Sequence, residues 1–233
     1  MKLNSISRLL FASLLIGNLT FAQDQPEKSK APKYEADMKK FEARDKATAP
    51  PEGVVLFVGS SSIRMWDLEK SWPKLSSLNN GFGGSTLADS IYHFERHIAP
   101  YKNPKAILIY AGDNDVSKGL NADEVLADFK TLLAKIKKAH PTTHVIFIAI
   151  KPSTKRWDMW PTMNDANQKI AELAKADVLL QYGDIATPTF GPDGGKPEDK
   201  WFKKDGLHLN EMGYAKWVEV IKPLLEKAGV YGK

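Results

Sequence analysis

Three consecutive serines, 60–62, follow a short apolar run that ends in Gly59. The run, Val54 to Val58, is rich in β-branched residues and contains no polar side chain, which predicts a strand buried on both faces. Hydroxyl groups at the carboxyl end of such a strand lie where α/β sheets bind ligands. The serines are therefore candidates for a nucleophile, an anion-binding turn or an ordinary polar loop.

A second candidate pair lies near the C-terminus, where Asp205 and His208 are separated by two residues. Ester hydrolysis through a serine needs a nucleophile, a base held by an acid, and donors aimed at the developing oxyanion. In a curved loop, the Asp205 carboxylate can fix the tautomer of His208 while the imidazole takes a serine proton. An isolated Asp-x-x-His segment more often caps a helix or lies on the surface, so this pair needs support from elsewhere.

Two further segments can supply oxyanion donors. The glycine-rich stretch 79–86 contains Gly84, and glycine lets a backbone N–H approach a ligand closely. The segment 112–115 follows another apolar run and contains Asn114, whose side-chain amide is a donor. Each segment taken alone is explained equally well by a tight turn.

Apolar runs alternate with helical patterns along the rest of the chain. Strands are predicted over 54–58, 75–78, 105–111, 144–150 and 178–182, and helices over 34–47, 63–72, 87–98, 122–139, 162–176 and 211–228. This alternation indicates parallel strands joined by right-handed crossovers, and hence an α/β fold built as a three-layer α/β/α sandwich. The loops that follow the strands then meet at the carboxyl edge of the sheet, together with a loop that carries Trp157 and Trp160.

Taken together, four blocks resemble the SGNH, or GDSL-like, esterase superfamily. The blocks are Gly59-Ser60-Ser61-Ser62, Asn80 to Ser85, Gly112-Asp113-Asn114-Asp115 and Asp205-Gly206-Leu207-His208. They occur in the family's order over residues 54–225, and four blocks are far more specific than any one of them. The resemblance implies a flavodoxin-like fold with a five-stranded parallel sheet, and an esterase that needs no metal and no other cofactor.

The resemblance also implies roles by position. Ser61 stands two residues after the strand-ending Gly59, where the family's Gly-Asp-Ser has its nucleophile. His208 corresponds to the general base and then the general acid, and Asp205 to its orienting partner. Ser60 occupies the position where the family most often has aspartate, which marks a Gly-Ser-Ser-Ser-Ile-Arg subgroup.

The same comparison implies an oxyanion hole formed by the backbone N–H groups of Ser61 and Gly84 and by the Asn114 side chain. Arg64, close to the serines, is a candidate for binding a polar or anionic substrate group, or for pairing with a carboxylate. Trp157 and Trp160 are candidates for stacking on sugar rings.

The tryptophans have an alternative explanation. Four tryptophans are expected near the carboxyl edge of the sheet, and each can instead hold a long loop onto the core. They are Trp66, Trp157, Trp160 and Trp201. We expect a small-molecule or polysaccharide substrate with a short acyl ester, such as an O-acetyl group on a carbohydrate. A lysophospholipase or longer-chain acyl esterase is the alternative, and a non-catalytic carbohydrate-binding relative is a third hypothesis.

Two apparent metal sites are not expected to bind metal. The segment 113–115 imitates a calcium loop, but Lys118 stands where an EF-hand needs glycine, and a strand precedes the segment. His93 and His97 are four residues apart on a predicted helix, but no third ligand is evident. A solvated helix face is the favoured explanation for the two histidines.

The composition sets limits on the function. The 233 residues are 42% hydrophobic, enough for one domain with a sizeable core. The absence of cysteine excludes disulfides, thiol nucleophiles and thiolate metal sites. Removing Lys2 and Arg8 with the first 22 residues lowers the net charge from +5 to +3. The remaining lysines form no basic stripe, so nucleic acid is not an expected partner.

Residues 1–22 have the pattern of a secretory signal peptide: a positive start, an apolar stretch over 9–19 and small residues before a cleavage site. The apolar stretch is about half the length that spans a bilayer. We expect cleavage after Ala22 and a periplasmic or secreted protein without stable membrane insertion, an uncleaved anchor being the alternative. Residues 23–52 are expected to form a lead-in with a peripheral helix, and residues 53–233 the hydrolase domain.

Overall fold

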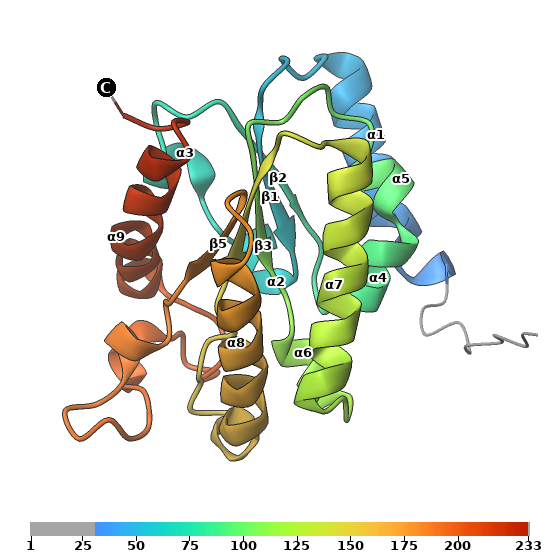
Figure 1. Ribbon diagram of the computed structural model, residues 1–233. Coiled ribbons are helices and arrows are strands. Elements are labelled where there is room, and N and C mark those ends of the chain that lie inside the picture. Colours follow the sequence, from blue (N-terminus) through green and yellow to red (C-terminus); the bar gives the residue numbers. More distant parts are fainter. Residues whose placement is uncertain (1–30, 233) are drawn as a thin grey trace, which may run out of the picture.

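The central sheet has five parallel strands in the order β2-β1-β3-β4-β5, with helices on both faces (Figure 1). The computed structural model describes residues 31–232, so the predicted signal peptide lies outside the described residues. The strands are β1 Val55–Gly59, β2 Ser77–Gly81, β3 Ala106–Tyr110, β4 His144–Ile148 and β5 Leu180–Gly183. The three-layer α/β/α fold with a five-stranded parallel sheet is confirmed, in the flavodoxin-like strand order.

Nine α-helices connect and cover these strands in the described part of the chain. They are α1 Glu35–Ala47, α2 Ser61–Arg64, α3 Leu68–Ser71, α4 Leu87–Tyr92, α5 Phe94–His97, α6 Asp113–Ser117, α7 Ala122–Ala139, α8 Trp160–Lys175 and α9 Glu211–Lys227. Helices α4, α5, α7 and α8 cover one face of the sheet, and α3 and α9 cover the other (Figure 1). None of the helices within residues 31–232 is long and apolar enough to cross a membrane.

Alternate side chains of β1 divide between the two cores. Leu56 and Val58 belong to the core beneath α7 and α8, whereas Val55 and Phe57 belong to the core beneath α9. Because successive side chains of a strand point to opposite faces, a fully apolar strand fits a sheet covered on both sides. This explains why the apolar run before the serines becomes a central strand.

Two of the four tryptophans considered above lie in the core. Trp66 stacks on Tyr214 with ring centroids 5.5 Å apart, and it is buried beneath α9. Trp201 is also buried, and its Nε1 donates to the carbonyl of Thr189 at 3.0 Å. Trp66 therefore packs the segment after α2 against α9, and Trp201 holds the 185–204 loop in place.

Most predicted boundaries lie within two residues of those in the structure, and four segments differ in more than this. Strand β2 takes in residues 79–81, so the glycine-rich loop is shorter than expected. The segment 113–115 begins a helix, α6, where the sequence suggested a loop. The helix predicted over 63–72 is two short helices, α2 and α3. The helix predicted over 87–98 is interrupted at His93, whose carbonyl contacts Nδ1 of His97 at 2.9 Å.

The solvated helix face expected for His93 and His97 is wrong. Both side chains are buried, and both rings meet the ring of Phe82 edge to face. Burial lowers the pKa of His97 to about 4 and also lowers the pKa of His93. These histidines are core residues, and residues 31–232 contain no group of three or more acidic, histidine or cysteine side chains placed to hold a metal ion.

Candidate active site

The candidate site lies at the carboxyl edge of the sheet, between β1 and β3, where the chain runs from β1 to β2 on one side and from β3 to β4 on the other. Such switch points form the ligand crevice of open α/β sheets. Gly59 ends β1 with φ of +138°, and a Cβ atom there would lie 1.9 Å from the carbonyl oxygen of Tyr110. Only glycine fits so close to β3, so the chain turns sharply and starts α2 with Ser61 at the crevice.

Of the three serines, only Ser61 reaches a histidine. Its Oγ lies 3.0 Å from Nε2 of His208. Ser60 and Ser62 are both buried, and the Ser60 hydroxyl has no hydrogen-bond partner within the described residues. The geometry thus separates three hydroxyls that the sequence leaves adjacent.

Asp205 fixes the orientation of His208. The Asp205 Oδ2 atom lies 2.6 Å from the histidine Nδ1, while Oδ1 accepts the backbone N–H groups of Leu207 and His208 at 2.9 Å each. An ionised carboxylate only accepts hydrogen bonds, so the Nδ1 atom carries the proton and Nε2 is left to accept from the Ser61 hydroxyl.

The charge of Asp205 is stabilised by the same contacts. Partial burial raises the pKa of the carboxyl, but the hydrogen bonds from the His208 ring and from the two backbone N–H groups outweigh it. The pKa of Asp205 is therefore held well below its usual range. The carboxylate remains ionised wherever the imidazole acts as a base.

The loop that carries this pair is attached to the segment after β4. Gly206 contributes its carbonyl, which accepts the N–H of Lys155 at 3.0 Å and the hydroxyl of Thr154 at 3.1 Å. Within the loop, the Lys203 N–H donates to the His208 carbonyl at 2.7 Å. These bonds fix the position of the irregular loop 203–208 relative to the segment that follows β4.

On the opposite side of the site, Asn114 is linked to Gly84 through Ser85, the residue that follows this glycine. The Asn114 Nδ2 donates to the carbonyl of Ser85 at 2.9 Å. Gly84 has φ of +77°, a conformation that favours glycine. The neighbouring Asp115 accepts the N–H of Leu87 at 2.9 Å. Asn114 thereby attaches α6 to the glycine-rich loop, and Asp115 attaches it to the start of α4.

Three charged residues beside Asn114 were not among the sequence-predicted site residues: Asp113 and Lys151 are buried, and Arg156 is half-buried. Lys151 is 2% exposed and its Nζ lies 3.4 Å from Asp113 Oδ2, while Arg156 Nη1 lies 3.3 Å from the same oxygen. Burial lowers the pKa of Lys151, and the carboxylates of Asp113 and Asp205 oppose that shift. The only sequence signal for Lys151 is that it directly follows the strand predicted over 144–150. A surface lysine can occupy the same position, so this signal does not identify a site residue.

The predicted substrate-binding residues have different surroundings. Arg64 is exposed, and its guanidinium lies against Gly83, where a Cβ atom would come within 2.9 Å of Cζ. Trp157 and Trp160 stack on each other with centroids 6.3 Å apart, and Phe190 meets both rings edge to face. Both tryptophans keep part of their surface exposed while they hold the 185–204 loop.

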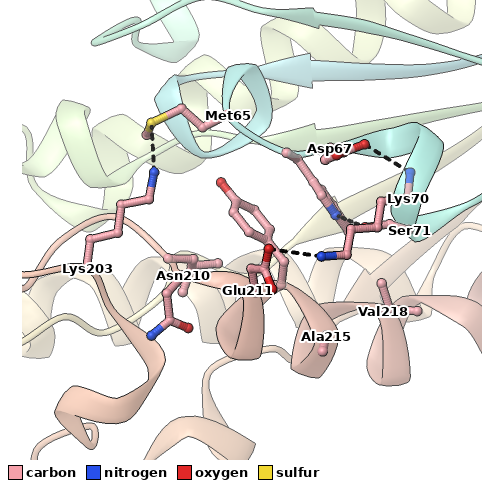
Figure 2. Close-up of a pocket in the computed structure, with 12 residues that line it drawn as sticks. Met65, Asp67, Lys70, Ser71, Lys203, Asn210, Glu211, Ala215 and Val218 are labelled. Atoms are coloured by element: carbon pink, nitrogen blue, oxygen red, sulfur yellow. Dashed lines mark hydrogen bonds and ion pairs between the residues drawn. The ribbon is translucent and has the colours of Figure 1, made fainter.

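A cavity of about 430 Å³ lies behind α2, between α2–α3 and α9 (Figure 2). Its apolar lining includes Met65, which follows α2, and Leu209, which follows His208. A hydrogen-bonded ion pair between Lys70 and Glu211 at 2.9 Å crosses its rim. Ser61 and His208 do not line this cavity, so it adjoins the site without being part of it.

A parallel sheet with serine, histidine and aspartate hydrogen-bonded in series at its carboxyl edge is typical of hydrolases that cleave esters. The GDSL-like lipase/acylhydrolase family model matches residues 64–216, which include Gly84, Asn114, Asp205 and His208 but not Ser61. The chain belongs to this family and is a carboxylic ester hydrolase. The predicted membership of the SGNH superfamily is confirmed.

Several solved structures share the fold of this chain. A GDSL-like lipase from Bacteroides thetaiotaomicron is 22% identical with a TM-score of 0.72, over 83% of this chain and 98% of that one. A carbohydrate esterase family 3 protein from Talaromyces cellulolyticus is 19% identical with a TM-score of 0.56, over 77% and 100%.

An acetyl-xylooligosaccharide esterase from Geobacillus is 17% identical with a TM-score of 0.57, over 79% of this chain and 99% of that one. At these identities the likeness to solved structures concerns the fold alone. No curated protein matches the sequence.

Proposed function

We propose that the protein is a serine esterase in which Ser61 is the nucleophile, His208 the general base and Asp205 its orienting partner. The observation that carries this proposal is the position of His208, 3.0 Å from the Ser61 hydroxyl and 2.6 Å from the Asp205 carboxylate. Both distances are within the range that proton transfer requires. No metal or other cofactor enters the proposed reaction.

The reaction proceeds in two halves. The Ser61 Oγ attacks the ester carbonyl carbon while its proton passes to Nε2 of His208, and the carbonyl electron pair moves onto the oxygen. Collapse of this tetrahedral species breaks the bond to the alcohol, which takes the proton from His208. Water then attacks the acyl-enzyme, giving a proton to His208, and the second collapse returns that proton to Ser61 and releases the acid.

The developing oxyanion is stabilised by three donors in this proposal. The N–H of Ser61 is at the start of α2, where an α-helix leaves its first N–H groups without intrahelical acceptors. The N–H of Gly84 and the second hydrogen of the Asn114 amide complete the set. Each donor of this kind typically contributes about 10²- to 10³-fold to kcat.

The decisive experiment compares three alanine variants of the adjacent serines. Ser61→Ala should lower kcat/KM for nitrophenyl acetate by roughly 10⁴- to 10⁶-fold, because a nucleophile cannot be partly replaced. Ser60→Ala and Ser62→Ala are matched controls and should keep most of the activity. A fluorophosphonate should label Ser61 in the wild-type protein. A folded Ser61→Ala protein with wild-type activity would overturn the proposal, and failure to label Ser61 would favour a carbohydrate-binding relative.

For the substrate, we propose short acyl esters, in particular O-acetyl groups on carbohydrates. Support comes from the partly exposed Trp157 and Trp160 beside a polar site and from structural neighbours described as carbohydrate and acetyl-xylooligosaccharide esterases. Arg64, Trp157 and Trp160 are the residues proposed to contact the polar part of the substrate. Release of acetate from acetylated polysaccharides is the direct measurement.

The apolar-lined cavity behind α2 favours a second candidate, an esterase or lysophospholipase that accepts a longer acyl chain. An acyl group that extends past Met65 would reach that cavity. A series of nitrophenyl esters separates the two. A steep fall in kcat/KM beyond acetyl or propionyl favours the acetylesterase. A rise with chain length that is abolished by Val218→Trp, which fills the cavity, favours the second candidate.

We also propose that the protein is exported and acts in the periplasm or outside the cell. The support is the signal-like pattern of residues 1–22. Mass determination of the protein recovered from a secreting host checks this proposal. A mature N-terminus at Gln23 is the expected result.

A further inference from the structure

Arg156 lies beside Asn114 and is not one of the residues that the sequence predicts for the site. It follows β4, and its backbone N–H donates to the hydroxyl of Ser153 at 3.2 Å, which turns the chain back towards α6. Its guanidinium side chain is only 17% exposed. The residue is therefore held in place from both its backbone and its side chain.

All side-chain contacts of Arg156 converge on the first turn of α6. Its Nη1 atom donates to the Asp113 carbonyl at 3.0 Å and to Asn114 Oδ1 at 3.1 Å, and forms the ion pair with Asp113 Oδ2 at 3.3 Å. The two residues that it contacts are more than 40 positions away in the sequence. The guanidinium therefore links the Asn114 side chain and the Asp113 carbonyl to the segment that follows β4.

The contact with Asn114 determines which end of the amide faces the substrate. A guanidinium only donates hydrogen bonds, so the amide atom beside Arg156 must be the oxygen. The amide nitrogen then donates one hydrogen to the Ser85 carbonyl at 2.9 Å, and its second hydrogen is directed away from that carbonyl. Rotation of the amide by 180° would place an N–H group against the guanidinium and is excluded.

The same contact increases the donor strength of the amide. A hydrogen bond from a charged donor draws electron density onto the Asn114 oxygen and makes the N–H hydrogens more positive. In a buried position this polarisation is weakly screened. An amide polarised in this way donates more strongly to a developing negative charge than to a neutral carbonyl, which favours the transition state over the bound ester.

We propose that Arg156 is a positioning residue of the oxyanion hole, which acts through Asn114 by fixing the orientation of its amide and by polarising it. This inference rests on the proposed esterase mechanism. Arg156 does not contact the substrate in this proposal, so its removal acts on kcat and leaves KM nearly unchanged. Its effect also disappears when the Asn114 amide is absent.

The test is a double-mutant cycle with Arg156→Ala and Asn114→Ala, measured with nitrophenyl acetate. Arg156→Ala should lower kcat roughly 10- to 100-fold, the range for loss of a hydrogen bond to a charged group, with KM within about two-fold. In the Asn114→Ala background the same change should lower kcat by less than about two-fold. Lys155→Ala, an exposed neighbour on the same loop, is the control and should retain wild-type kcat.

Two further measurements address folding and mechanism. Guanidinium or methylguanidinium chloride at millimolar concentration should restore part of kcat to Arg156→Ala but none to the double variant. Arg156→Gln, which keeps a donor for Asn114 without the charge, should fall between the wild type and Arg156→Ala. If Arg156→Ala does not fold, the partial loss in Arg156→Gln and its absence in the Asn114→Ala background carry the test.

Three results would overturn the proposal: a multiplicative loss of kcat in the double variant, a raised KM with unchanged kcat, or a wild-type kcat in Arg156→Ala. Each would assign Arg156 to the substrate or to the fold alone. The esterase mechanism fails separately, through an active Ser61→Ala protein. An inactive Ser61→Ala protein combined with a wild-type Arg156→Ala protein would therefore reject only the inference about Arg156.

Discussion

Asp205 and His208 lie in an irregular loop with side chains 41% and 26% exposed, whereas Asn114, across the crevice, lies in a helix turn and is 9% exposed. The contacts that orient His208 come from a residue three positions away in the chain. The contacts that orient Asn114 come from Ser85 and Arg156, at separations of 29 and 42 residues.

The two side chains are thus oriented in different ways, His208 by contacts within its own loop and Asn114 by contacts with distant segments. On the base side, one aspartate binds a ring and two backbone N–H groups within a single loop, so the orientation is a local property. On the oxyanion side, the orientation depends on a buried network that joins the ends of β2, β3 and β4. We therefore expect substitutions of Asp205 or His208, on the base side, to lower activity with little change in stability. Substitutions in the network around Asn114, on the oxyanion side, should change both.

The largest expected effect tests the base side. His208→Ala should lower kcat/KM by about 10⁴-fold or more, since no other group takes the Ser61 proton. Because the ring is partly exposed and its bonds are local, the free energy of unfolding should change by less than about 1 kcal/mol. Activity assays and urea unfolding of the same preparation check both statements.

Asp205→Asn serves as the companion variant, because it keeps an oxygen for the backbone N–H groups while it removes the charge. It should also lose activity, with no more than a small fall in the urea midpoint, because the carboxylate that it removes is 41% exposed and its charge is screened by water. A marked fall in the midpoint for either variant would show that the base side is part of the folding core, and the contrast between the two sides would fail.

A smaller effect, on stability, tests the oxyanion side. Lys151→Met should lower the free energy of unfolding on the order of 3 kcal/mol, because it leaves a buried carboxylate with one cation in place of two. The Asp113 Oδ1 atom already has no hydrogen-bond partner within residues 31–232, so little can compensate. Urea unfolding measures the change.

Lys155→Met is the matched control, since this lysine is exposed and lies four residues further along the same loop. Its free energy of unfolding should stay within about 0.5 kcal/mol of the wild type. Equal midpoints for Lys151→Met and the wild type would mean that the buried ion pair contributes nothing to the stability of the oxyanion side.

The parts of the fold that the sequence predicts well are those with local signals. Helix α7 begins and ends at the predicted residues, because Asn121 and Glu124 form a capping box before a strong apolar face. Strand β2 was placed too early because its last residues are polar. Asn79 and Asn80 are accommodated there by hydrogen bonds to the carbonyls of Ile63 and His97, which no local pattern reveals.

The candidate site divides in the same way. The Asp205–His208 pair is a short segment and could be recognised as a unit, and the structure places it beside Ser61. Lys151 and Arg156 could not be recognised, because their partners in α6 are about 40 residues away and lysine and arginine are usually found on the surface. A charged residue becomes part of a site through burial, and burial is a property of the whole fold.

Measured per pH unit, the smallest expected effect compares two aspartates at the same edge of the sheet. Hydrogen bonds hold the pKa of Asp205 well below its usual range. Burial, together with Asp113 and Asp128, raises the pKa of Asp115 to about 7. A carboxyl with a raised pKa binds its proton more tightly in the folded state than in the unfolded chain, where the pKa is about 3.9. Folding stability then falls as the pH rises between these two values.

Asp115→Asn removes this titration and keeps an oxygen for the N–H of Leu87. From about pH 4 to pH 7, the wild-type protein should therefore lose stability relative to Asp115→Asn, on the order of 1 kcal/mol per pH unit. Asp205→Asn should run parallel to the wild type above about pH 5, because the stabilisation by ionised Asp205 is complete above its unfolded pKa of about 3.9 and declines only below it. Urea unfolding at several pH values measures both curves. If Asp115→Asn also runs parallel to the wild type, the buried side does not hold a protonated carboxyl, and the two aspartates differ in exposure alone.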